Sequence, residues 1–171
     1  MSANPILVEV TRGDMVESFH CGAISVVKSD GQTMLTVGDT QRLIYPRSAI
    51  KPLQAIYLIE SGAAEAFDLT DTELALACAS HNGEIGHITA VRAWLARLGL
   101  EEEVLECGAH APRRNEDRAA LVKDNLSPGP AHNNCSGKHC GFLSSARHIG
   151  LATEGYILKE HPIQQAVLGL I

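Results

Sequence analysis

The sequence has few aromatic residues and no long apolar run. Phe, Trp and Tyr make up only 4% of its 171 residues. No apolar stretch approaches the roughly 18 residues that a membrane-spanning helix needs. Residues 1–14 also lack the basic segment followed by an apolar one that marks a secretory signal. These absences argue against a membrane protein and a secreted one, so we expect a cytoplasmic location.

Basic residues never form a run, and the net charge is −6. This excludes the positive surface that binding to nucleic acid or to an anionic membrane requires, and favours a small-molecule substrate. The five cysteines are an odd number in a chain without a signal peptide, which argues against a disulfide framework. Reduced thiols or a metal site are the better interpretations.

The hydrophobic content of 45% is typical of one globular domain with a single core. Residues 6–45 carry short β-branched segments that predict an antiparallel meander with a final strand at 43–45. Within it, Asp30-Gly31 predicts a type I′ hairpin turn. The rest of the chain predicts helices, at residues 48–60, from a capping box at 70–73 to about 80, at 87–98 with Gly99 as its stop, at 115–123, from the polar cluster 132–140 to about 148, and from Pro162 onward.

The expected fold class is therefore α/β in the broad sense, more strictly α+β, with helices packed on an antiparallel sheet. The last helix is apolar and stops without a cap or a polar tail, which indicates a sequence cut off at its C-terminus.

A Ser-x-x-Lys motif stands at the predicted start of the first helix, as Ser48-Ala49-Ile50-Lys51. Residues i and i+3 share a face in α and in 3₁₀ geometry, so Lys51 can take the proton of Ser48 as the serine attacks a carbonyl. The helix N-terminus offers positive potential and N–H donors for an oxyanion. The motif alone is weak, because Ser25-Val26-Val27-Lys28 repeats it in a predicted strand, and a helix cap beside a surface lysine is the competing interpretation.

A second polar element, Ser80-His81-Asn82-Gly83-Glu84, follows a predicted helix directly. In serine acyl-enzymes with a Ser-x-x-Lys nucleophile, a Ser-x-Asn element supplies a proton-shuttling hydroxyl and an amide that orients the substrate. The competing interpretation is a helix end with turn-forming residues. Arg47, His81 and Asn82, which flank the two serines, are the candidate substrate-binding residues.

A third cluster surrounds Cys135 and Lys138, with His132, His139 and Cys140 close by. Such a density of thiol and imidazole groups suggests a metal, with zinc as the default. Lysine is outside the usual ligand set of zinc because it must first lose its proton. A loop of small residues with a free thiol and an anion-binding lysine is therefore the alternative.

Together, four segments resemble the rhizobial-type L-asparaginase family, of the asparaginase II kind, over essentially all of the 171 residues but only about the first half of a family member. They are residues 8–13, 46–54, 79–84 and 134–139. The resemblance implies a fold similar to the serine β-lactamases and penicillin-binding proteins, and a chain that is the N-terminal part of a single asparaginase domain.

The resemblance also implies roles for individual residues. Ser48 would be the nucleophile, Lys51 its base, and Ser80 a member of a second Ser-Lys pair. Cys135 and Lys138 would hold a zinc ion. The third zinc ligand, a further cysteine, and the lysine that partners Ser80 would lie beyond residue 171, and the full-length enzyme would be a homodimer.

The leading hypothesis is an amidohydrolase that converts L-asparagine to L-aspartate and ammonia through a Ser48 acyl-enzyme. Two alternatives stay open: a catalytically silent remnant that binds ligand or metal, and a β-lactamase-like acyl-enzyme. The absence of a signal peptide argues against the second alternative, since penicillin-recognising enzymes generally work outside the cytoplasm. The classical Thr-Gly-Gly-Thr asparaginase segment has no match in the sequence.

Overall fold

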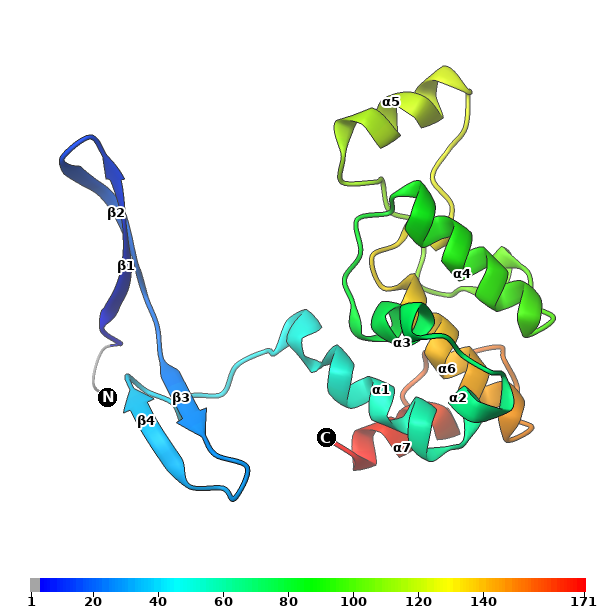
Figure 1. Ribbon diagram of the computed structural model, residues 1–171, viewed down its shortest axis with the longest axis horizontal. Coiled ribbons are helices and arrows are strands. Elements are labelled where there is room, and N and C mark those ends of the chain that lie inside the picture. The colour runs from blue at the N-terminus through cyan, green and yellow to red at the C-terminus, as the bar shows by residue number, and fades with distance from the viewer. Residues whose placement is uncertain (1–3) are drawn as a thin grey trace. The chain divides into compact units, whose positions relative to one another are not determined.

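A computed structural model describes residues 4–171, which divide into two compact units at the Tyr45–Pro46 link (Figure 1). The first unit holds only strands and the second only helices. The mixture of helices with small antiparallel sheets agrees with the predicted α+β class. Among the described residues, none of the helices is both long and apolar enough to cross a membrane.

The strand unit consists of two separate hairpins rather than the predicted continuous meander. β1 (Ile6–Arg12) pairs with β2 (Met15–Cys21), and β3 (Ile24–Val27) pairs with β4 (Thr33–Val37). The strand expected at residues 43–45 does not form. β-branched and aromatic residues favour a strand only where a partner strand pairs with them, and within residues 4–171 no strand pairs with residues 43–45.

The predicted β3–β4 hairpin is present, but its turn is of a different type. Only Gly31 has a positive φ there, of 85°, whereas a type I′ turn needs positive φ at two central residues. The amide of Gly31 donates to the Lys28 carbonyl, and the amide of Lys28 donates to the Gln32 carbonyl. This is the hairpin in which a glycine in the left-handed region follows a tight turn, so Asp30 keeps a relaxed backbone.

The helical unit follows the predicted order closely. Its elements are η1 (Arg47–Ile50), α1 (Lys51–Glu60), α2 (Ala63–Ala66), α3 (Asp71–Cys78), α4 (Ile85–Arg97), η2 (Glu102–Val104), α5 (Asn115–Lys123), η3 (Pro130–His132), α6 (Ser136–His148) and α7 (Pro162–Gly169). The short elements η1, α2, η2 and η3 were not predicted as separate helices. They are single turns, too short to show a helical period in the sequence.

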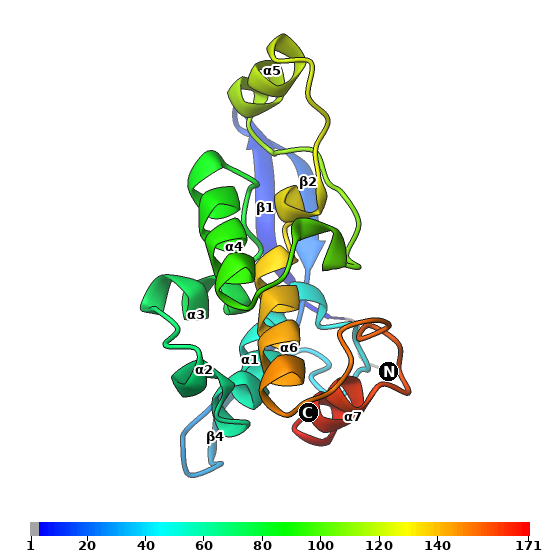
Figure 2. The same cartoon turned by 90° about the vertical axis from the view of Figure 1, so that its right-hand side faces the viewer.

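The core of this unit forms around α6, which contacts α1, α2, α3, α4 and α7 (Figure 2). All of α6 from Ser136 to Ala146 is buried apart from Lys138. The predicted apolar stripe of α4 is confirmed, because Ile88, Val91 and Leu95 are buried and Gly99 ends the helix with a φ of 67°. α6 therefore brings the segment around residue 135 into the interior, beside the C-terminal end of α3 and the start of α1.

The capping box predicted at the start of α3 is also present. The Thr70 hydroxyl accepts from the Glu73 amide, and the Glu73 carboxylate accepts from the Thr70 amide. Arg97 of α4 donates to the same carboxylate at 3.0 Å. This arrangement fixes where α3 begins. It therefore also fixes the positions of Ala79 and Ser80, which follow the end of the helix.

Candidate active site

Ser48 lies in η1, the single 3₁₀ turn that leads into α1, and its side chain is exposed. Arg47 beside it has a φ of 52°, which a residue with a Cβ rarely adopts. Within the part of the chain that the structure describes, no hydrogen bond joins the Ser48 hydroxyl to the Lys51 amine. The structure thus places the two residues of the predicted pair one turn apart, but with Lys51 turned to other partners.

Lys51 is the first residue of α1 and is only 2% exposed. Its Nζ donates to the Ala79 carbonyl at 2.6 Å and to the Asn134 carbonyl at 3.1 Å. The third neighbour is Ser80 Oγ at 2.9 Å. A buried amine therefore joins three segments: the start of α1, the end of α3 and the loop before α6.

The three partners of Lys51 differ in what they can do with a proton. The carbonyl oxygens of Ala79 and Asn134 can only accept, so Lys51 has to donate to both of them. A hydroxyl can both donate and accept, so the contact with Ser80 is the one in which the direction of donation can reverse. An uncharged Lys51 can keep both carbonyl partners and take the proton of Ser80.

Ser80 begins the turn that was singled out in the sequence, and it is exposed while its neighbour His81 is buried. The His81 amide donates to the Asn134 carbonyl at 3.3 Å, the same oxygen that accepts from Lys51. The Asn82 side chain donates to Glu84 at 3.2 Å, and the Asn82 carbonyl accepts from the Arg113 amide at 2.9 Å. Backbone and side-chain bonds thus hold the whole turn in place.

Two hollows flank this turn. One, of about 450 Å³, is lined by Thr72, Ala75, Leu76, Ala79, Ser80, His81, Asn82 and His87. It is the hollow that the Ser80 hydroxyl borders, so a substrate that reacts with Ser80 would lie there.

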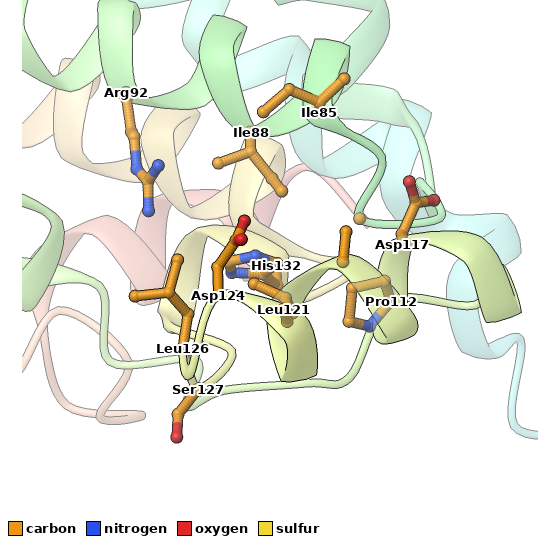
Figure 3. Close-up of a pocket in the computed structure, with 12 residues that line it drawn as sticks. Ile85, Ile88, Arg92, Pro112, Asp117, Leu121, Asp124, Leu126, Ser127 and His132 are labelled. Atoms are coloured by element: carbon orange, nitrogen blue, oxygen red, sulfur yellow. The ribbon is translucent and has the colours of Figure 1, made fainter.

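The other hollow is a cavity of about 290 Å³ between α4, α5 and η3 (Figure 3). Apolar side chains such as Ile88 and Leu121 face it, together with Asp117, Asp124 and His132. Neither Lys51 nor Ser80 lines this cavity. It lies against the turn through Gly83 and is separate from the hollow that Ser80 borders.

The predicted metal ligands Cys135 and Lys138 lie at the start of α6, one turn apart. Burial lowers the pKa of Lys138, and the positive charge of Lys51 lowers it further, while Cys135 and Cys107 oppose the change. The ε-ammonium also stands 5.5 Å from the centre of the Phe142 ring. A lysine that loses its proton more easily is what a metal ligand requires, so the donor chemistry of Lys138 fits zinc.

The same cluster contains Cys107, which the sequence did not single out. Burial is the main cause that raises the pKa of its thiol to about 11, with Cys135 adding to the rise and Lys138 opposing it. Asn133 joins the two segments, because its Nδ2 donates to the Cys107 carbonyl at 2.7 Å while its Oδ1 accepts from the Cys135 amide at 2.8 Å. Among residues 4–171, no group of three or more His, Cys, Asp and Glu side chains is arranged to hold a metal. Cys135 and Lys138 thus fit as part of a zinc site but do not close one.

Two further groups of the site, both close to the start of α6, are not apparent from the sequence. One is the backbone carbonyl of Asn134, which no side-chain motif can reveal because every residue has a carbonyl. The other is Ser136, whose hydroxyl lies 2.8 Å from His81 Nε2. Both belong to the segment that the polar cluster at 132–140 had already marked, which was the available signal.

Of the comparisons with known proteins, the one with family models gives a match. The family model described as L-asparaginase II matches residues 8–171, which is nearly the whole chain. A search of curated proteins finds no match. The chain therefore belongs to the L-asparaginase II family.

Proposed function

We propose that this protein hydrolyses the side-chain amide of L-asparagine to L-aspartate and ammonia through a serine acyl-enzyme. Family membership supports the reaction. The observation that carries the mechanism is the buried Lys51, held between two carbonyl oxygens with the Ser80 hydroxyl as its third partner. A lysine placed in this way can remove the proton of a hydroxyl and return it.

The reaction has two halves. In the first, a serine Oγ bonds to the carboxamide carbon, its proton passes through Lys51 to the departing nitrogen, and the C–N bond breaks to release ammonia. In the second, a water molecule loses a proton to Lys51 and attacks the ester. The ester bond then breaks, the serine recovers its proton, and aspartate leaves.

The nucleophile is proposed to be Ser48, with Ser80 as the group that relays protons between it and Lys51. The exposed position of Ser48 at the start of α1 leaves its hydroxyl accessible. The Ser-x-x-Lys motif at a helix start followed by a Ser-x-Asn turn also supports the proposed similarity to the serine β-lactamase fold.

A second assignment exchanges the two serines. In it, Ser80 attacks the substrate directly, and the 2.9 Å contact between Ser80 Oγ and Lys51 Nζ favours this version. Both assignments need Lys51 and give the same products, so they differ only in which serine carries the acyl group.

A zinc ion is proposed to bind at Cys135 and Lys138, with further ligands completing its coordination. Bound there, zinc would act as a Lewis acid or would brace the loop. The remaining proposals from the sequence are a small-molecule partner, L-asparagine, and assembly into a homodimer.

Ammonia release from L-asparagine by the purified protein is the first test, with aspartate measured in the same samples. Ser48→Ala, Ser80→Ala and Lys51→Met should each lower the rate. Ser25→Ala should not, because Ser25 lies in β3 and belongs to the other Ser-x-x-Lys motif. A folded protein that releases no ammonia would refute the proposed reaction.

Acid quenching during turnover, followed by peptide mapping, identifies the nucleophile. An acyl group on the peptide that contains Ser48 supports the leading assignment, and one on Ser80 supports the exchanged assignment. Near-normal turnover by Ser48→Ala together with loss of turnover in Ser80→Ala would overturn the leading assignment.

A further inference from the structure

His81 is buried inside the turn that begins with Ser80, and both of its ring nitrogens already have partners. The imidazole is 5% exposed. Nδ1 accepts from the Gly83 amide at 3.1 Å, and Nε2 lies 2.8 Å from the Ser136 hydroxyl. A side chain with both nitrogens engaged has no hydrogen-bonding group left for a substrate.

These contacts fix the direction of every hydrogen bond. The Gly83 amide can only donate, so Nδ1 of His81 carries no proton and the neutral ring is protonated at Nε2. Nε2–H then donates to Ser136 Oγ, and the Ser136 hydroxyl donates to the Ala131 carbonyl at 3.0 Å. One ordered chain of hydrogen bonds therefore runs from the turn at residue 83 to the segment that leads into α6.

This chain of hydrogen bonds connects the two segments whose backbone carbonyls accept from Lys51. The Ala79 carbonyl immediately precedes the turn, and the Asn134 carbonyl belongs to the segment before α6. The His81 amide also donates to the Asn134 carbonyl. The main chain and the side chain of His81 therefore both join the turn to the segment before α6. If the two segments separated, Lys51 would lose one of its two carbonyl partners.

We propose that His81 is a positioning residue that clamps the Ser80 turn to the start of α6 through Ser136, and thereby holds Lys51 beside Ser80. This assigns His81 a role other than the substrate contact expected from the sequence. It rests on the proposed function, since Lys51 and Ser80 are the groups whose geometry it preserves.

The packing around His81 supports the clamp. Its ring stacks on His87 of α4, with ring centres 5.1 Å apart. Gly83, whose amide donates to His81, lies close to the His132 carbonyl. A Cβ added at Gly83 would lie 2.9 Å from that oxygen. Burial, together with the charges of His87, Lys51 and His132, lowers the pKa of His81 to about 4. The ring is therefore neutral at physiological pH, in the form that the clamp needs.

A double-mutant cycle on ammonia release tests the proposal. His81→Ala and Ser136→Ala should each lower kcat about ten- to a hundredfold while KM changes little, because misplacement of a catalytic group affects the chemical step more than binding. The double variant should be no slower than the slower single variant, since both changes break the same bond. The exposed His110→Gln, in the same unit, serves as the control and should leave both constants unchanged.

Rescue by a conservative variant separates positioning from bulk. His81→Gln can place an amide N–H near the position of Nε2 and should recover much of kcat when Ser136 is present, but not in the Ser136→Ala background. The opposite result overturns the proposal: a rise in KM with kcat retained for His81→Ala, and no effect of Ser136→Ala, would identify His81 as a substrate contact.

A measurement without turnover keeps this outcome distinct from failure of the proposed function. In ¹⁵N-labelled protein, the imidazole of His81 should show a protonated Nε2 and an unprotonated Nδ1. Ser136→Ala should shift the Nε2 resonance and the amide resonance of Ser80. A shift of both with no ammonia release would uphold the clamp and refute the reaction, whereas an Nδ1-protonated ring, or no change at Ser80, would refute the clamp.

Discussion

Lys51 Nζ and Ser80 Oγ lie 2.9 Å apart, although 29 positions separate the two residues in the sequence. The contact depends on α1, which begins at Lys51, and on α3, which ends just before Ala79. Neither helix could make it alone. The chemistry of the site is therefore a product of packing, and α6 is the element against which both helices pack.

Lys51→Met should abolish most of the activity and leave the fold intact. The methionine side chain fills a similar volume in the buried site but can neither donate to the two carbonyls nor exchange a proton with Ser80. Loss of a general base typically lowers kcat by about 10²–10⁴-fold. The comparison is kcat for Lys51→Met and for Lys28→Met, in the other Ser-x-x-Lys motif. Equal activity of the two variants would remove Lys51 from the mechanism.

Much of the helical unit could be predicted because its signals are local. Thr70 and Glu73 form the predicted cap, and Ile88, Val91 and Leu95 show a helical period that their burial confirms. The Lys51 environment could not be predicted, because its acceptors are backbone carbonyls of Ala79 and Asn134 from distant segments. No residue type marks such an acceptor, and only the packing of α3 and α6 brings the two together.

The Ser-x-x-Lys pair illustrates a different limit. Spacing correctly predicts that Ser48 and Lys51 lie one turn apart, but not which hydroxyl the lysine contacts. A long lysine side chain can reach acceptors in several directions. Lys51 is buried, and its amine lies toward acceptors in the protein interior rather than toward the exposed Ser48. Candidate residues could thus be identified from the motif, whereas their pairing depends on the structure.

Thr70→Ala should destabilise the helical unit by about 0.5–2 kcal/mol, the usual cost of losing a helix cap. The hydroxyl of Thr70 accepts from the Glu73 amide, and that partner would be left without an acceptor. Thr72→Ala is the matched control, because Thr72 is exposed in the first turn of the same helix. Urea denaturation compares the two, and equal midpoints would show that the cap contributes nothing.

Gly137→Ala should also destabilise the protein, by about 1–3 kcal/mol, the typical cost of overpacking. A Cβ at this position would overlap the carbonyl group of Leu76, so α6 would have to move away from the end of α3. That displacement would reach Ala79 and Ser80, and activity should fall as well. Gly86→Ala is the control, since nothing lies within 4 Å of a Cβ added there.

The stability of the native state should fall as the pH is lowered from 6.5 toward 4. Burial holds the pKa of His81 near 4, below its ordinary value of 6.5. In that window the unfolded chain therefore binds a proton at this residue and the native state does not. The free energy of unfolding consequently decreases as the solution becomes more acidic. The charges of His87, Lys51 and His132 also oppose protonation of the ring.

His81→Gln should reduce this acid sensitivity, because glutamine does not titrate. Urea denaturation at several pH values between 7.5 and 4.5 gives the slope for each variant. The exposed His20→Gln is the control and should retain the slope of the unaltered protein. An identical slope for His81→Gln would mean that other groups account for the acid sensitivity.

Cys135→Ser and Lys138→Met should each weaken zinc binding by the purified protein, whereas Cys78→Ser should not. Cys135 and Lys138 stand one turn apart at the start of α6, and burial lowers the pKa of the lysine toward the uncharged form that binds metal. Cys78 is a thiol of similar partial exposure at the end of α3. Competition with a chromogenic chelator measures the affinity without reference to activity. If all three variants bind zinc as tightly as the unaltered protein, the metal lies elsewhere and Cys135 and Lys138 serve the packing of the loop. If neither the variants nor the unaltered protein bind zinc, the proposed zinc site is refuted.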